Sequence, residues 1–407
     1  MKSGRRRRRR KFLMVLPFAI LFMACVSVGC VSGATPPEEA WNMTFGGPDR
    51  DVARSVQQTA DGGYILAGGT YSFETGGSDA RIVKTDSVGN ELWNKTFGGA
   101  NHDWAISVQQ TVDGGYILAG GTDSYGAGRS DAWLIKTDSM GNELWNKTFG
   151  GTDGDWAISI QHTTDGGYIL AGYTRSYGAG SSDMWLLKTD SKGREQWNET
   201  FGGTGSDVAF SVQHTMDGGY IIAGYTRSYV AGYGSDMWLL KTDSKGREQW
   251  NKTFGGAGLD GASYVQQTTD GGYIIAGDLE PYGVNSKPDA WLVKTDSAGN
   301  EQWNMTFGGP DWDRASSAQQ TVDGGYIVAG ETESYVVDTA DAWLLKTDSS
   351  GTALWNKTFG GTELDGVNAV RQTADGGYII AGSTESYDAS DRDFWLVKVN
   401  EELKNLR

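Results

Sequence analysis

The stretch Lys136–Gly151, KTDSMGNELWNKTFGG, decides the fold, because its pattern recurs along the chain at an almost constant interval. Its last seven residues match WNxTFGG, and this pattern occurs seven times in the 407 residues. The copies lie 52, 52, 52, 53, 53 and 52 residues apart, at Trp41, Trp93, Trp145, Trp197, Trp250, Trp303 and Trp355. Such regular spacing indicates one supersecondary unit repeated in tandem.

Each unit contains four short segments in which apolar and polar residues alternate, which is the period of a β-strand and not of a helix. In one unit these segments are Trp145–Gly151, Ala157–Thr163, Tyr168–Thr174 and Asp183–Thr189. The second and third are separated by TDGG, which favours a tight two-residue hairpin because Asp and Gly tolerate positive φ. Four antiparallel strands in about 50 residues are typical of one propeller blade.

The sequence therefore predicts an all-β protein, a seven-bladed β-propeller of four-stranded antiparallel blades over residues 35–400. The short DSxGNE turn makes the DAWLxK strand and the next WNxTFGG strand hairpin neighbours. Small side chains such as Ala157 and Ser159 favour the AxSV strand as the innermost one, so WNxTFGG is expected to be outermost. We expect residues 40–46 to pair with 393–399 and close the ring, and residues 401–407 to form a polar tail.

The first 34 residues have the pattern of an export signal. A basic run, Arg5–Lys11, precedes 17 apolar residues, Phe12–Val28, and a small-residue exit at Ser32–Ala34. This apolar run is short for a membrane span of about 20 residues, and an uncleaved N-terminal anchor is the alternative. Ser27–Cys30 also resembles a bacterial lipobox, with Cys30 as the lipidated residue. We expect an exported protein, extracellular or at the cell surface, which contacts a membrane only if this segment is retained or lipidated.

Charge and cysteine content exclude some classes of partner and cross-link. The formal net charge is −16, and removal of the first 34 residues with their eight basic side chains makes it −24. So acidic a chain argues against binding nucleic acid, which requires a basic surface. The two cysteines, Cys25 and Cys30, both lie in the export segment, so no disulfide is expected to stabilise the fold.

Three carboxylates and two tryptophans recur in nearly every unit. A residue needed equally in each copy has a structural role, because catalysis uses one asymmetric set of groups; we expect turn caps and contacts to backbone amides. The tryptophans are expected to fill the wedge between blades. The only histidines, His102, His162 and His214, suggest neither a metal trio nor a catalytic triad, and neither a metal nor a cofactor is predicted. The three carboxylate rings are Asp51, Asp103, Asp155, Asp207, Asp260, Asp313 and Asp365; Asp61, Asp113, Asp165, Asp217, Asp270, Asp323 and Asp375; and Asp79, Asp131, Asp183, Asp236, Asp289, Asp341 and Asp393.

The run Phe149–Ser176, FGGTDGDWAISIQHTTDGGYILAGYTRS, resembles the seven-bladed β-propeller repeat of secreted and surface proteins of bacteria and archaea. The resemblance extends over all seven copies, with DGGY at the hairpin as the departure from the family pattern. It implies a propeller exported from a prokaryotic cell, with no activity attached.

Every WNxT is also an N-glycosylation sequon. Two interpretations stay open: a glycoprotein, or Asn and Thr retained for contacts along the strand. The candidate sites are Asn42, Asn94, Asn146, Asn198, Asn251, Asn304 and Asn356.

The loops after FGG and after YILAG are expected on one face of the disc, and they vary in sequence and length between copies, as binding loops do. Exposed aromatic residues among acidic and hydroxyl groups suit a glycan or a protein partner. The leading hypothesis is a non-enzymatic binding or adhesion scaffold. The alternative is a secreted hydrolase or lyase acting on polysaccharides over the central channel, near Arg50, His102, Asp153, Asp311 and Glu363. The candidate ligand-binding residues are Trp104, Trp156, Trp312, Tyr125, Tyr177, Tyr229, Tyr233, Arg50 and His102.

Overall fold

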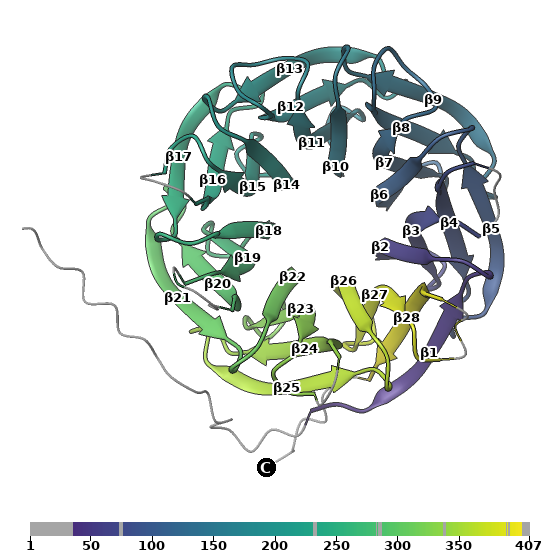
Figure 1. Ribbon diagram of the computed structural model, residues 1–407, viewed down its shortest axis with the longest axis vertical. Helices are drawn as coiled ribbons and strands as arrows, with labels where there is room; N and C mark the ends of the chain where they lie inside the picture. Colours follow the sequence, from purple (N-terminus) through teal and green to yellow (C-terminus); the bar gives the residue numbers. More distant parts are fainter. Residues whose placement is uncertain are drawn as a thin grey trace, which may run out of the picture.

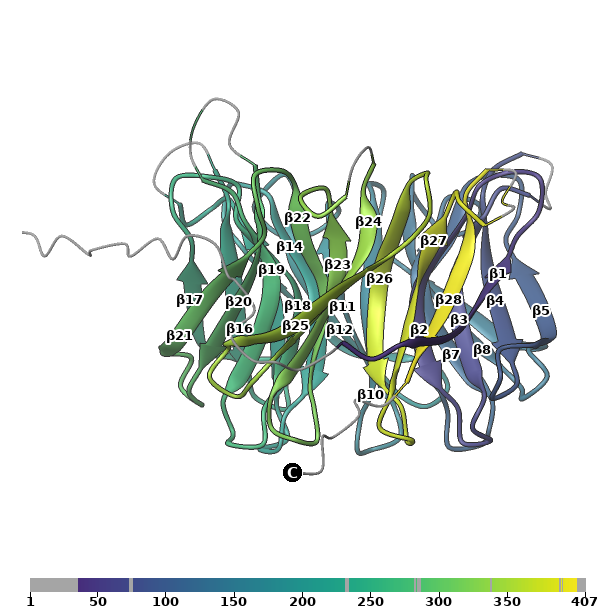
Figure 2. The ribbon, with the colours of Figure 1, turned by 90° about the horizontal axis from the view of Figure 1, so that it is seen from below.

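The computed structural model describes residues 36–72, 76–230, 234–281, 283, 287–336, 339–387, 389 and 391–400. The described residues form 28 strands in seven four-stranded antiparallel sheets, arranged as a ring around a central opening (Figure 1). Seen from the side, the strands run between the two faces of a disc (Figure 2). The chain is thus the predicted seven-bladed β-propeller.

The strand order within each blade is also as predicted. The AxSV strands are innermost: β2 (Asp51–Gln58), β6 (Asp103–Gln110), β10 (Asp155–His162), β14 (Asp207–His214), β18 (Gly261–Gln267), β22 (Asp313–Gln320) and β26 (Asp365–Gln372). Next are β3 (Tyr64–Thr70), β7 (Tyr116–Thr122), β11 (Tyr168–Thr174), β15 (Tyr220–Thr226), β19 (Tyr273–Leu279), β23 (Tyr326–Thr332) and β27 (Tyr378–Thr384). The third strands are β4 (Asp79–Thr85), β8 (Asp131–Thr137), β12 (Asp183–Thr189), β16 (Asp236–Thr242), β20 (Asp289–Thr295), β24 (Asp341–Thr347) and β28 (Asp393–Val399). The outermost are β5 (Glu91–Phe97), β9 (Glu143–Phe149), β13 (Glu195–Phe201), β17 (Glu248–Phe254), β21 (Glu301–Phe307), β25 (Ala353–Phe359) and β1 (Glu39–Phe45). We number the blades 1 to 7 from β2.

The ring is closed by the two ends of the described chain. Strand β1 pairs antiparallel with β28, with Asn42 opposite Val397 and Thr44 opposite Trp395, and so completes blade 7 (Figure 1). Closure of this kind removes the exposed edges that an open array of sheets would leave.

Tryptophans of the outermost strands pack between blades, as predicted. In all seven interfaces the indole lies against the tyrosine of the DGGY turn of the next blade, with ring centroids 5.7 to 6.5 Å apart. The tryptophans of the third strands, such as Trp133, Trp238 and Trp395, are buried among aliphatic residues. Seven hydrophobic clusters, each shared by neighbouring blades, therefore make up the core.

The DGGY hairpin is longer than the tight turn predicted from TDGG. Five residues, 163–167, separate β10 from β11, and Gly166, not the aspartate, takes the positive φ of 81°. Asp165 instead uses its carboxylate, which accepts from the Gly167 amide at 3.1 Å and from the hydroxyl of Thr163. A Cβ on Gly167 would approach the Thr189 carbonyl oxygen to 2.1 Å, so both glycines are required.

Candidate functional site

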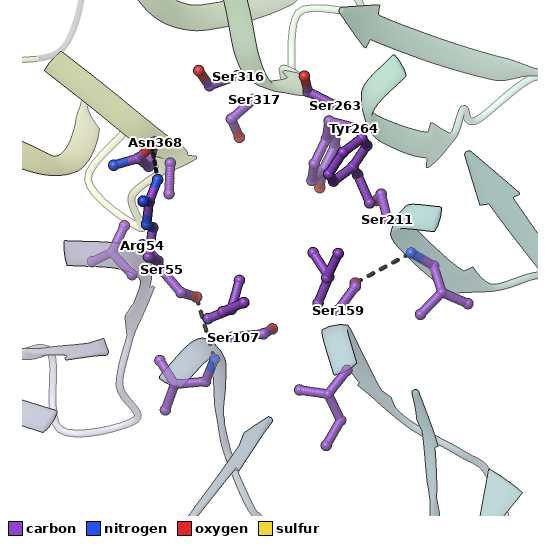
Figure 3. A pocket seen from close by; sticks show the side chains of 18 of the residues that line it. Arg54, Ser55, Ser107, Ser159, Ser211, Ser263, Tyr264, Ser316, Ser317 and Asn368 are labelled. Carbon is purple, nitrogen blue, oxygen red and sulfur yellow. Dashed lines mark hydrogen bonds between the residues drawn. The ribbon is translucent and has the colours of Figure 1, made fainter. Parts of the chain in front are cut away.

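The central channel is a cavity of about 450 Å³ lined by side chains from the innermost strands of all seven blades (Figure 3). Three layers of side chains line it. In blade 1 these are represented by Arg54, Ser55 and Gln57. The volume is within the range of roughly 300–1,000 Å³ that is usual for small-molecule sites.

Two of these layers hold neighbouring blades together. In the glutamine layer, Gln57 Oε1 accepts from the backbone amide of Gln110 in the next blade at 2.6 Å, and equivalent bonds recur around the ring. In the serine layer, Ser55 Oγ accepts from the amide of Val108 at 3.3 Å, again with equivalents elsewhere. These repeated residues therefore have a structural role.

The remaining layer differs from blade to blade and divides the channel into two walls. Blades 2, 3 and 4 contribute Ile106, Ile158 and Phe210, so this wall is apolar. Blades 5, 6, 7 and 1 contribute polar side chains instead, namely Ser263, Ser316, Asn368 and Arg54 (Figure 3). Exceptions to the serine and glutamine layers fall on this polar side too: Tyr264, Ala369 and Arg371.

Arg54 and Arg371 are the charged residues among those lining the cavity. Arg54 donates to Asn368 Oδ1 at 3.3 Å, across the junction between blades 1 and 7. Arg371 donates to Ser317 Oγ at 3.3 Å, and its guanidinium lies 5.3 Å from the ring centroid of Tyr264. Neither guanidinium forms an ion pair with a carboxylate of the described residues.

The same division continues at the mouth of the channel on the loop face. Trp104 and Trp156 each pack over a glycine of the preceding blade, Gly69 and Gly121, where a Cβ would approach the indole to 2.2 and 2.6 Å. At the matching positions in blades 5 and 6, Asp278 faces Arg314, with oxygen and nitrogen 3.9 Å apart. One side of the mouth is thus aromatic and the other charged.

Burial has a marked effect on the acids of the charged side. Burial, opposed by Arg314, raises the pKa of Asp278 to about 7. It also raises the pKa of Glu331, although Arg314, Arg392 and Arg54 act in the opposite direction. Both carboxyl groups are therefore less readily ionised than a solvent-exposed acid.

The loops of this face are anchored by one of the predicted aspartate rings. Asp103 is fully buried and accepts from the Gly99 amide at 2.8 Å, from Ser124 Oγ at 2.6 Å and from the hydroxyl of Thr122. A second ring acts similarly, since Asp131 accepts from the amides of Ala127 and Gly128. These contacts confirm the structural role expected for the carboxylates.

The predicted tyrosines are partly exposed, but their hydroxyl groups are engaged. Tyr177 donates to the Gly150 carbonyl at 2.8 Å and Tyr229 to that of Gly202 at 2.9 Å, and Tyr125 makes the equivalent bond. The rings of these three tyrosines lie 5.5 to 6.2 Å from the buried tryptophans of their own blades. Tyr233 lies outside the described residues, as does Cys30.

The other predicted binding residues lie apart on the loop face. Trp312 is half-buried, with Lys287 5.4 Å and Arg314 4.8 Å from its ring centroid. His102 is exposed, and its Nδ1 accepts from the Ser78 amide at 3.0 Å. Arg50 is exposed at the end of the loop before β2. Sequence reasoning missed Tyr173 and Tyr225, which are half-buried beneath Arg175 and Arg227 at 5.6 and 5.8 Å.

The residues of the enzymatic alternative occupy five different blade connections. The backbone amides of Asp153, Asp311 and Glu363 each donate to the hydroxyl of a serine in the loop between the second and third strands of the blade that follows. No contact joins any two of Arg50, His102, Asp153, Asp311 and Glu363 within the described part of the chain. The described residues also contain no group of three or more His, Cys, Asp or Glu side chains placed to hold a metal ion. Across the same residues, no helix has the length and apolar character needed to cross a membrane.

The sequon asparagines already have hydrogen-bond partners. Asn146 Nδ2 donates to Glu143 Oε1 at 2.6 Å, and its Oδ1 accepts from the Trp133 indole at 3.4 Å; blades 3 to 5 repeat both bonds. Five of the seven asparagines are exposed, whereas Asn42 and Asn356 are half-buried. A contact role for the side chain is thus observed, and glycosylation stays a prediction.

The fold and the channel define a class, the seven-bladed β-propellers, and comparison with known proteins gives no narrower assignment. No family model matches the chain. It is 27% identical over 230 residues to the regulatory protein FlaEY of Caulobacter vibrioides, which covers 47% of this chain and 24% of that protein, so the chain matches only about a quarter of the relative's length.

Solved structures that are similar in fold include the following two. Sqt1 from Chaetomium thermophilum has a TM-score of 0.51 at 9% identity, covering 90% of this chain and 99% of that one. Polysaccharide lyase Uly1 has a TM-score of 0.51 at 10% identity, covering 85% and 89%. At such low identity these likenesses establish the propeller architecture alone.

Proposed function

We propose that this protein is a non-enzymatic, exported binding scaffold that takes a glycan or protein partner on its loop face. The observation that supports this proposal most is that the residues holding the blades together are repeated, whereas the exposed residues of the loop face are not. Buried aspartates hold a loop in every blade, and serines and glutamines join most blades to their neighbours, while the exposed loop residues differ between blades. Variation of this kind on a rigid scaffold is characteristic of recognition surfaces.

Rigid aromatic side chains favour such a role. Because the tyrosine hydroxyls are fixed to glycine carbonyls, rings such as Tyr177 and Tyr229 present an exposed edge without losing much conformational freedom on binding. Trp312 is half-buried with two cations near its ring, and its exposed part would contact a sugar ring or a protein side chain.

The test is a glycan-array and pull-down screen with the full chain, followed by two matched variants. Trp312→Ala removes an aromatic surface from the loop face. Val322→Ala changes a side chain that is 91% exposed on a DGGY turn of the opposite face. We expect Trp312→Ala to lower the affinity for the captured partner by about tenfold or more, because loss of a central aromatic contact has an effect of this size. Val322→Ala should leave the affinity unchanged. Equal affinity in both variants would place the partner elsewhere and contradict the proposal.

A further inference from the structure

The geometry points to a second binding site, inside the central channel, for a small carboxylate carried on an apolar body. This site is separate from the loop-face contacts of the proposed function. It depends on the two walls of the cavity, one cationic and one apolar, and on two arginines that form no ion pair with a carboxylate among the described residues.

The cationic wall provides the donors that an anion needs. Arg54 uses one nitrogen on Asn368, and Arg371 uses one on Ser317 and on the Val370 carbonyl, so further N–H groups of both guanidinium forks are available. Such forks match the geometry of a carboxylate. Arg54 is exposed to the channel; desolvation there, followed by the charge of Arg50, lowers its pKa, whereas Glu331 raises it, and a bound anion would act in the same direction as Glu331.

The opposite wall gives the site its second property. Ile106, Ile158 and Phe210 face the same cavity, and Phe210 is 37% exposed there. An apolar group of a ligand would cover these side chains and gain the free energy of their burial. Charge alone would make the channel a site for any anion, whereas this wall selects one with an apolar body.

Comparison between blades indicates that the arginines are not needed for the frame. Six blades have glutamine where blade 7 has Arg371, and each of five of these glutamines accepts a backbone amide of the next blade. Isoleucine, serine and phenylalanine all occupy the position of Arg54 elsewhere. The substitutions Arg371→Gln and Arg54→Ile therefore restore residues that the fold already accommodates.

The experiment is calorimetric titration of the full chain with 4-phenylbutyrate, its amide, and 4-phenylbutylamine. We expect the carboxylate to bind at millimolar concentration or below and the amide and amine to bind at least about tenfold more weakly, a difference of about 1.4 kcal/mol. Arg371→Gln and Arg54→Ile should each lower the affinity for 4-phenylbutyrate by about tenfold. The unfolding midpoint of the protein should be unchanged in both variants. Phe210→Ser, which copies Ser263 and Ser316, should weaken phenylbutyrate more than acetate.

A second pair of probes separates the two sources of this chemistry. A short apolar peptide with a free C-terminus is compared with the same peptide carrying a C-terminal amide. Binding of the free form alone identifies a peptide terminus as an occupant, and binding of phenylbutyrate alone identifies a free acid. If no carboxylate binds at millimolar concentration, or if binding is the same in Arg371→Gln and Arg54→Ile as in the parent, the inference is wrong. Either result leaves the loop-face proposal intact, because that proposal is tested with Trp312→Ala.

Discussion

Individual residues break the sevenfold symmetry of this molecule in a consistent direction. Arg54, Asp278, Arg314, Glu331 and Arg371 all belong to blades 5, 6, 7 and 1, and all lie in the channel or at its mouth. None of the equivalent positions of blades 2 to 4 is charged: Arg54 and Arg314 are replaced there by apolar or aromatic side chains, and Arg371 by glutamine. A molecule built from seven similar copies therefore has one polar and one apolar side around its axis.

Asp278 provides a test of this charged side through the pH dependence of stability. Its pKa in the folded protein, about 7, exceeds the ordinary value of 3.8, so the folded state binds the proton more tightly than the unfolded chain. This group therefore contributes stability as the pH falls from about 7 toward 4. We expect Asp278→Asn to raise the free energy of unfolding at pH 8 by about 1 to 2 kcal/mol, and to have little effect at pH 4.

Denaturant unfolding at both pH values measures this difference, with exposed Asp311→Asn as the control. Destabilisation by Asp278→Asn at pH 8 would show instead that its charge is needed by Arg314.

At the scale of the strand and turn, a buried lysine connects the third strand of each blade to its DGGY hairpin. In blade 3, Lys188 Nζ lies 2.9 Å from Asp165 Oδ2 and donates to the Thr189 carbonyl at 2.8 Å. The lysine side chain is 4% exposed and the aspartate 53%. Equivalent pairs occur in all seven blades. This pair explains why KTD and DGG recur together.

We expect Lys188→Met to lower the free energy of unfolding by about 2 kcal/mol. Removing one partner of a fully buried pair costs about 3–5 kcal/mol, and the loss is smaller here because Asp165 remains half in contact with solvent. The control is Lys192→Met in the next turn, which is exposed and should change stability by less than about 0.5 kcal/mol. The midpoints of denaturant unfolding of the two variants measure this difference. Equal midpoints would mean that the Lys188–Asp165 pair does not contribute to stability.

The strand order and ring closure could be predicted because they depend on period and connection length, both of which are local properties. The Lys188–Asp165 pair was missed, since a lysine in an alternating strand pattern is expected at the surface. The packing of Trp104 on Gly69 was also missed, because it joins residues on different blades. For the same reason Trp104 was predicted as a ligand contact without its packing role, and Arg54, Asp278 and Arg371 were not predicted as parts of a site.

At the scale of the whole molecule, two groups of carboxylates set opposite limits on stability. Burial raises the pKa of Asp61 less than hydrogen bonds from Thr59 and Lys84 lower it, so its pKa is about 2, and Asp113, Asp165, Asp217 and Asp270 behave alike. Their contribution is present above about pH 4 and is lost as the pH falls toward 2. Burial, followed by a neighbouring aspartate, instead raises the pKa of Asp236, Asp341 and Asp393 to about 6, so their contribution grows as the pH falls through 6.

We therefore expect the thermal midpoint of the full chain to be highest near pH 4 to 5, below the neutral range. A series of thermal scans between pH 2 and 9 measures it. If the thermal midpoint instead rises steadily up to pH 8, then Asp236, Asp341 and Asp393 do not take up protons in the folded protein near pH 6.

The junction of blades 7 and 1 has its own chemistry, which marks it among seven similar interfaces. Arg81 replaces the tryptophan of the other third strands, is 2% exposed, and lies 3.5 Å from Asp51 and 5.4 Å from the Phe394 ring centroid. Arg54 and Asn368 meet across the same junction on the channel side. Closure of the ring thus also places Arg54 beside Asn368 in the wall of the channel.

The whole ring depends on the pairing of β1 with β28, because closure holds both walls of the channel in place. Cysteines at Asn42 and Val397, which are directly opposite in register, test it in a chain whose residues 36–400 contain no cysteine. The measurement is the mass and electrophoretic mobility of the oxidised double variant, N42C/V397C. We expect an intramolecular disulfide in the folded monomer of the double variant and none in either single variant. A double variant that stays reduced, or that forms only disulfide-linked dimers, would contradict the pairing of β1 with β28.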